Sequence, residues 1–572
     1  MNKKFIFFAS IIFSLYATSF AQTSEKKNTF THADTLRGSL NENRDWWDVL
    51  RYDITVKPDF ETKTIEGKVA ITFSPLKEKK TIQIDLQSPL IIDSVLHLKS
   101  KQSFSKVDSN VWLIQLKTLS KKITKGKEPV SVTIPDEKIV IYYHGKPREA
   151  KFPPWDGGWI WKKDKNGNPW MSVACQGLGA SVWYPCKDYQ GDEPDSGASL
   201  TIIVPDTLVA VANGRLINTL KIANSSLTSY TWQVKNPINN YLIIPSIGKY
   251  VNFTDTLHGE KGILNLSYWV LDYNIHDAQE QFKQVKPMLR AFEYWFGPYP
   301  FYEDSYKLVQ SPHLGMEHQS AIAYGNQFKN GYLGRDLSGT GWGLKWDYII
   351  VHESGHEWFA NNITTKDIAD MWIHEGFTDY SETLFIEYYY GKKAANEYNY
   401  GLRKNIQNDA PIIGMYGVNK EGSGDMYFKG ANLLHTIRHS INNDTLFRKI
   451  LRGLNKTFYH QTVTSAQIEK FISTKAGFNY NNVFNQYLRT TQIPVLEFSI
   501  NNNNQSITYQ WTNCNKDFNL PLTIDNDTTL VTLFPETKQK TSILTTEQLK
   551  LITSNLIEQL YYVKTKQIAQ TN

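Results

Sequence analysis

Acid and imidazole side chains near the middle of the chain have the spacing of a catalytic zinc site. The motif H-E-x-x-H spans His352 to His356, and Glu375 follows it after eighteen intervening residues. Residues four apart lie on the same face of a helix, so both imidazoles can face one ion while Glu353 borders that face. Two His ligands and one Glu ligand leave the fourth tetrahedral position open for water, as in catalytic sites. The sequence predicts one zinc ion per chain; the alternative is a pair of structural histidines on a surface helix.

Two helices must position these side chains. The apolar run from Gly343 to Val351 predicts a buried helix that leads into the motif. A second helical pattern, from Asp367 to Gly391, places Glu375 in its first turns. Asp379 and Glu382 follow Glu375 by four and seven residues on the same face. Either carboxylate could therefore orient a ligating imidazole.

The first 21 residues have the pattern of a secretory signal peptide. Lys3 and Lys4 precede an apolar core from Phe5 to Tyr16, and Ser19 and Ala21 form a small-residue cleavage pattern. We therefore expect removal of residues 1–21 on export to the periplasm or the medium, with an uncleaved anchor as the alternative. No later stretch reaches about 18 uninterrupted apolar residues, so the mature chain is expected to have no stable membrane span.

Composition narrows the possible partners. The chain carries 62 basic and 56 acidic side chains, and its Lys-rich runs at 76–80 and 119–127 lack interleaved aromatic residues. These runs predict solvated turns, so no nucleic-acid partner is expected. Only three cysteines occur, which excludes a disulfide scaffold. Cys175 and Cys186 could pair across a hairpin or remain buried free thiols.

The residue pattern changes twice after the predicted signal peptide. Residues 22–253 alternate short β-rich runs with turns, which predicts an N-terminal β domain. Residues 254–491 are dominated by helical patterns and contain the predicted zinc site. Residues 492–572 return to short strands and predict a small C-terminal β-sandwich. The expected fold class is multi-domain α+β.

Three segments carry a resemblance to a known family. They are HESGHEWFANNIT at 352–364, DMWIHEGFTDYSE at 370–382 and LGMEH at 314–318. In that order they resemble the H-E-x-x-H-x-W-x-G-N, W-x-N-E-G-F-x-x-Y-x-E and G-x-M-E-N motifs of the aminopeptidase N family of zinc metallopeptidases, which includes leukotriene hydrolase. Ala360 replaces a Gly and His374 an Asn of these patterns. In LGMEH, Leu314 and His318 are substituted, whereas Glu317 is retained.

Further matches extend the resemblance to most of the chain. The segment CQGLGASVWYPCKD at 175–188 is similar to a family segment that helps hold the substrate's N-terminus, which implicates Gln176. The segment YFKG at 427–430 is similar to the family segment that supplies a catalytic tyrosine, which implicates Tyr427. The resemblance implies an N-terminal β saddle domain and a thermolysin-like α/β-α catalytic domain. The large helical C-terminal domain common in the family is not expected. The family pattern also favours Glu382 over Asp379.

The resemblance implies a secreted zinc-dependent aminopeptidase that acts on peptides with a free N-terminus. Glu317 would pair with the substrate's α-ammonium group, Glu353 would be the general base and Tyr427 would stabilise the oxyanion. The alternatives are a thermolysin-like endopeptidase and a non-catalytic secreted peptide-binding protein. His318 is expected to become cationic below about pH 6.5 and to compete for the carboxylate of Glu317.

Overall fold

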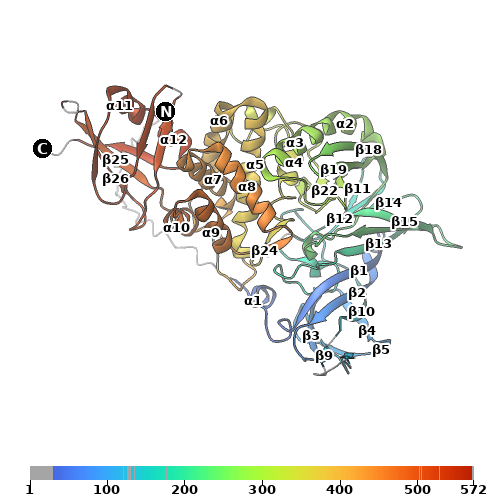
Figure 1. The fold of residues 1–572 in the computed structure, drawn as a ribbon. Coiled ribbons are helices and arrows are strands. Elements are labelled where there is room, and N and C mark those ends of the chain that lie inside the picture. Colours follow the sequence, from blue (N-terminus) through green and yellow to red (C-terminus); the bar gives the residue numbers. More distant parts are fainter. Residues whose placement is uncertain are drawn as a thin grey trace, which may run out of the picture.

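The computed structural model describes residues 30–119, 122–124, 131–133, 135–175, 177–501, 503, 505–526 and 528–569. The predicted signal peptide and Gln176 lie outside these residues. The described part has a mixed α+β fold, in which a β-rich N-terminal region is followed by a largely helical region and a second β-rich region (Figure 1). None of the described helices is long and apolar enough to cross a membrane.

An eight-stranded sheet forms most of the N-terminal region. Its strands lie in the order β15 (Arg215–Lys221), β16 (Leu227–Val234), β13 (Ala198–Pro205), β1 (Trp47–Asp59), β2 (Thr64–Pro75), β10 (Glu137–Gly145), β4 (Ile91–His97) and β5 (Ser100–Lys101). Buried and partly exposed residues alternate along most of β1, so one face of this strand packs on the core. A second sheet shares that core and has the order β11 (Gly158–Lys163), β12 (Pro169–Ala174), β17 (Ser246–Gly248) and β14 (Val209–Val211).

Cys175 and Cys186 are both buried in this region and are not joined by a disulfide. Burial raises the pKa of both thiols well above the ordinary value. Of the two alternatives for this pair, the structure therefore has the buried free thiols.

A five-stranded sheet connects the N-terminal region to the helices. Its order is β18 (Tyr250–Gly259), β19 (Gly262–Leu271), β20 (Tyr306–Gln310), β22 (Ile322–Tyr324) and β21 (Gly315–Met316). β21 pairs only with β22 within the described sheets, so it is an edge strand, and Glu317 follows it directly. The predicted boundary at residue 253 falls inside β18. The domain limits themselves remain predictions.

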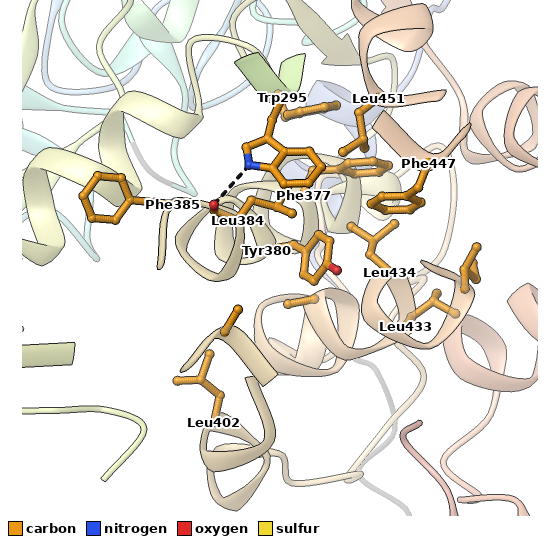
Figure 2. Packing of buried hydrophobic residues seen from close by; sticks show 14 of the residues in the cluster. Trp295, Phe377, Tyr380, Leu384, Phe385, Leu402, Leu433, Leu434, Phe447 and Leu451 are labelled. Carbon is orange, nitrogen blue, oxygen red and sulfur yellow. Dashed lines mark hydrogen bonds between the residues drawn. The ribbon is translucent and has the colours of Figure 1, made fainter. Parts of the chain in front are cut away.

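Helix α5 (Trp372–Tyr390) is the centre of the helical region. It contacts α3 (Val285–Phe296), α4 (Tyr348–Gly355), α6 (Lys392–Leu402) and α7 (Phe428–Ile441). Every residue of α5 from Trp372 to Ile386 is buried. Figure 2 shows aromatic and leucine side chains of several helices packed together here, and Trp295 donates a 3.1 Å hydrogen bond to the carbonyl oxygen of Leu384. The helix that carries Glu375 is therefore fixed on several sides.

The C-terminal region contains the predicted strands and two helices that were not predicted. A four-stranded sheet has the order β29 (Lys540–Ile543), β26 (Ser506–Thr512), β25 (Val495–Asn501) and β30 (Lys564–Gln567), and β27 (Leu522–Asp525) pairs with β28 (Leu530–Leu533). Both sheets contribute to one buried core. The two unpredicted helices, α11 (Thr546–Thr553) and α12 (Leu556–Leu560), pack on β27, β28 and β30 beside these sheets.

Candidate active site

Helix α4 presents both histidines of the H-E-x-x-H motif. Its N-cap Asp347 is buried and accepts hydrogen bonds from the backbone N–H groups of Ile349 (3.0 Å) and Ile350 (3.3 Å). This cap satisfies two of the amides that a helix start leaves without partners. The helix ends at Gly355, and His356 stands at its C-cap with backbone angles that are still helical. The two imidazoles therefore face the same side, with ring centres 5.1 Å apart.

Glu375 in the first turn of α5 completes a cluster of three donors. Its Oε2 atom lies 3.9 Å from Nε2 of His352 and 3.4 Å from Nε2 of His356. One donor atom from each of the three residues lies within 4.8 Å of the others, and all three residues are buried. Oε2 of Glu375 is enclosed and receives no conventional hydrogen bond from the described residues. Two imidazole nitrogens and a carboxylate with this spacing fit a zinc ion.

The charge balance of the cluster also calls for a cation. Burial alone would lower the pKa of His356, but neighbouring carboxylates raise it to about 10. These carboxylates belong to Glu375, Glu317 and Glu353. Three acids around one imidazole favour a positive charge at this point, and a divalent ion supplies it.

Hydrogen bonds to the outer ring nitrogens orient both imidazoles. Glu382 lies 2.7 Å from Nδ1 of His352, and its other oxygen accepts a 2.6 Å hydrogen bond from Tyr398. Of the two candidate carboxylates, Glu382 makes this contact rather than Asp379. On the second imidazole, Nδ1 of His356 lies 3.1 Å from the hydroxyl of Thr378. Contacts of this kind fix ring orientation and leave Nε2 free for the ion.

A cavity of about 460 Å³ opens over the three donors, and Glu353, Glu317 and Tyr427 line it. Burial, the largest effect, raises the pKa of Glu353 well above the ordinary value. Glu317 is 5% exposed, burial raises its pKa, and its Oε1 accepts a 3.1 Å hydrogen bond from Tyr241. The side-chain amide of Asn361 donates to the backbone oxygen of Glu317 at 2.8 Å. Glu317, the residue expected to bind the substrate's α-ammonium group, is thus held in the same cavity as the metal donors.

Tyr427 directly precedes α7 and stacks on His352, with ring centres 6.3 Å apart and planes 21° apart. Burial and the charges of Glu375 and Glu421 raise the pKa of its hydroxyl well above the ordinary value. The phenol therefore stays protonated at neutral pH. A protonated hydroxyl beside the donors can give a hydrogen bond to a developing oxyanion.

His318 behaves differently from the sequence-based expectation. Burial, together with the neighbouring His313, lowers the pKa of His318 well below 6.5. Its imidazole is therefore neutral at mildly acidic pH and cannot compete as a cation for Glu317. The expected pH dependence was wrong because the sequence does not show that this side chain is enclosed. His374 is also buried, and its Nε2 accepts a 2.9 Å hydrogen bond from the backbone of Thr365.

Several contact residues were missed by the sequence analysis. Tyr348 stands one turn before His352 and lies 3.2 Å from its Nδ1, and Thr378 stands three residues after Glu375. Helical spacing could have indicated both. Tyr241 and Trp155 reach the site from the N-terminal region, and no local pattern links them to it.

Comparison with known proteins agrees with this geometry. Residues 49–242 match the peptidase M1 N-terminal domain, and residues 280–487 match the peptidase family M1 domain. The two matches are consecutive parts of one family architecture, so the chain belongs to peptidase family M1. This agrees with the resemblance to the aminopeptidase N family.

Curated relatives are distant in sequence. The chain is 23% identical to aminopeptidase N of Lactobacillus helveticus, with 78% of this chain and 51% of the relative covered. It is 22% identical to leukotriene A-4 hydrolase of Xenopus laevis, with 72% and 66% covered. It is 23% identical to endoplasmic reticulum aminopeptidase 1 of Mus musculus, with 50% and 31% covered. The chain thus spans between about a third and two thirds of the length of these relatives.

Solved structures share the fold. A crystal structure of an M1 zinc metallopeptidase variant from Deinococcus radiodurans bound to a Tyr-Ser-Ala substrate superposes with a TM-score of 0.62 at 18% identity, covering 78% of this chain and 95% of that one. A two-domain M1 zinc metallopeptidase variant bound to L-tryptophan gives a TM-score of 0.61 at 19% identity, covering 76% and 92%.

Proposed function

We propose that this protein is an exported zinc aminopeptidase that removes the first residue from peptides with a free N-terminus. The observation that carries the proposal is the position of Glu317, an anchor for an ammonium group, in the cavity that also contains the three metal donors and Glu353. His352, His356 and Glu375 would hold one zinc ion. When bound, zinc would polarise the scissile carbonyl and lower the pKa of water.

The chain's own residues set the register of the substrate. The carboxylate of Glu317 favours the α-ammonium group and disfavours an internal peptide segment, which has no such charge. β21 is an edge strand within the described sheets and lines the cavity, so the edge of β21 that faces away from β22 can pair with an extended peptide. A Cβ atom on Gly315 would lie 2.6 Å from Oε1 of Glu353, so a residue larger than glycine at this position would displace the carboxylate. In this proposal, these contacts would bring the first peptide bond beside Glu353.

Proton movements then follow from the positions of Glu353 and Tyr427. Glu353 accepts a proton from the attacking water and returns it to the leaving amine. The hydroxyl of Tyr427 donates a hydrogen bond to the tetrahedral oxyanion. Glu382 and Thr378 keep the two imidazoles oriented throughout the cycle.

Export to the periplasm or medium rests on the pattern of residues 1–21. N-terminal sequencing of the protein recovered from outside the cytoplasm would test it. A chain that starts at Met1 would contradict removal of a signal peptide.

The catalytic proposal is tested by Glu353→Gln beside His356→Ala. We expect Glu353→Gln to retain one zinc per chain and to lose about 10²- to 10⁴-fold in kcat on an amino-acid arylamide, because only the base is removed. His356→Ala should lose both metal and activity. Near wild-type kcat in Glu353→Gln would contradict the mechanism. Cleavage of N-acetylated peptides at internal bonds would instead identify an endopeptidase, and peptide binding without any hydrolysis would identify a binding protein.

A further inference from the structure

A second cavity lies next to the catalytic one. Its volume is about 660 Å³, and it shares Trp155 and Leu314 with the lining of the catalytic cavity. Its walls come from β12, from the segment after β19 and from the loops after β20 and β22. Nine of the nineteen lining residues are aromatic or apolar, and the charged groups are Lys163, Asp164, Lys165 and Asp277, beside His313. The proposed hydrolysis of a first peptide bond does not by itself require this cavity.

The direction of a bound peptide follows from two fixed points along β21. Glu317, after the strand, would hold the α-ammonium group. Gly315, within the strand, lies so near Glu353, the proposed base, that a Cβ atom added to it would be 2.6 Å from Oε1. A peptide that starts at Glu317 and presents its first bond to Glu353 therefore runs backwards along β21 and continues past Leu314. Residues along an extended chain are about 3.3 Å apart, so the residues after the scissile bond reach Leu314 and the mouth of the second cavity.

Trp155 stands at that mouth on a loop of fixed shape. Its side chain is 66% exposed, although it lines both cavities. The loop is held by Asp156, whose carboxylate accepts hydrogen bonds from the backbone N–H groups of Lys151 (2.8 Å) and Phe152 (2.6 Å). Arg148 donates to the same carboxylate at 3.2 Å. An exposed indole on a loop of this kind is a preformed wall for an extended ligand.

The second cavity is also held in place relative to the catalytic region. Trp170 on β12 donates a 2.9 Å hydrogen bond to the hydroxyl of Tyr250, which in turn donates to the carbonyl oxygen of Gln310 on β20 at 2.7 Å. Figure 1 shows β12 near the five-stranded sheet, in agreement with the hydrogen bond from Trp170 to Tyr250 on β18. The two sides of the cavity are thus joined directly.

We propose that the second cavity binds the substrate residues that follow the scissile bond, with Trp155 packing against them. The inference rests on the proposed function and specifies its substrate class: peptides of three or more residues with apolar side chains after the first. Such peptides bury apolar surface against Trp155 and the aromatic walls. An amino-acid amide ends at the scissile bond and makes none of these contacts.

The test compares leucinamide with the tetrapeptide Leu-Ala-Phe-Phe in wild type, Trp155→Ala and Phe152→Ala. Phe152 is the matched control because it is 75% exposed on the same loop and does not line either cavity. We expect Trp155→Ala to lower kcat/KM for the tetrapeptide about tenfold more than kcat/KM for leucinamide, because tenfold is the size of a well-placed aromatic contact. Phe152→Ala should leave both substrates within about twofold, and Trp155→Phe should lie between wild type and Trp155→Ala.

An equal loss on both substrates, or no loss on either, would overturn the inference while leaving aminopeptidase activity intact. The same holds if wild type shows no preference for the tetrapeptide over leucinamide. Failure of zinc-loaded wild type to hydrolyse leucinamide, the tetrapeptide and an amino-acid arylamide would overturn the proposed function, and with it this inference.

Discussion

The two halves of the candidate site are assembled in different ways. All metal donors and the side chains that orient them, except Tyr398, come from α4, its C-cap and α5, two successive helices that pack on each other. The substrate side combines Trp155 and Tyr241 from the N-terminal region with Glu317 after β21 and Tyr427 before α7. The first half depends on helix geometry, and the second depends on how distant parts of the chain dock. Changes in the first half should therefore affect metal affinity, and changes in the second should affect transition-state or substrate binding.

Of the changes that probe this contrast between the two halves, Tyr427→Phe should give the largest effect. Loss of the hydroxyl removes a donor to the oxyanion, so kcat should fall by about 10²-fold with little change in KM. Steady-state kinetics on an amino-acid arylamide measures this, with zinc content as the control for an intact metal half. A raised KM at unchanged kcat would show that Tyr427 binds the substrate and does not stabilise the oxyanion.

Glu382→Gln probes the metal half. The variant weakens the hydrogen bond to Nδ1 of His352, so zinc affinity should fall by about 10- to 100-fold. Competition with a chelator measures the affinity. Asp379→Asn is the matched control, because Asp379 is an adjacent buried carboxyl with no hydrogen bond to either imidazole among the described contacts. Equal losses in both variants would show that the helix, rather than the specific contact, determines affinity.

Tyr241→Phe probes the docking of the N-terminal region. It removes the 3.1 Å hydrogen bond to Glu317, and a bond of this type contributes about 1 kcal/mol. KM for a peptide with a free N-terminus should therefore rise about fivefold, since each 1.4 kcal/mol corresponds to tenfold. Zinc affinity should not change. A loss of zinc would show that the two halves are not independent.

Glu193→Gln tests the pH sensitivity of the contact between the two regions. Glu193 is buried, and the hydroxyl of Thr364 lies 3.5 Å from its carboxylate. Burial, then the charge of Asp195, raises the pKa of Glu193 from 4.5 to about 8. Between pH 4.5 and 8 the folded chain thus keeps a proton that the unfolded chain releases. The contribution of protonated Glu193 to the free energy of unfolding is therefore fully present below pH 4.5 and is lost as pH rises through 8. Melting temperatures of wild type and Glu193→Gln should therefore diverge at pH 9, with the variant higher, and agree better at pH 5.

Ala360→Gly should give the smallest effect, with an unusual sign. Ala360 follows the zinc motif with φ of 145°, a conformation that glycine adopts more easily. Relief of strain offsets the lost methyl group, so the free energy of unfolding should stay equal or rise by less than about 1 kcal/mol. Ala369→Gly, at a buried position without positive φ, should lose about 1 kcal/mol. Urea unfolding of both variants would decide, and equal losses would exclude strain at Ala360.

The same contrast explains what the sequence could predict. The H-E-x-x-H spacing and helical period were enough to bring His352, His356 and Glu375 together, because they lie on α4, at its C-cap and on α5. Burial was not predictable, so the neutral state of His318 was missed. Trp155 and Tyr241 were missed because their positions depend on contacts between regions far apart in the chain. α11 was missed although Thr545 and Gln548 form a capping box at its start.

The loop held by Asp156 has a thermodynamic consequence for peptide binding. Ordering one flexible residue costs roughly 1–2 kcal/mol of backbone entropy. Here the hydrogen bonds from Lys151 and Phe152 fix the loop in the free protein. This entropy is lost during folding, so the association step does not have to lose it again. The free energy of the contacts that Trp155 makes with a peptide is therefore offset by almost no entropy cost of ordering the loop.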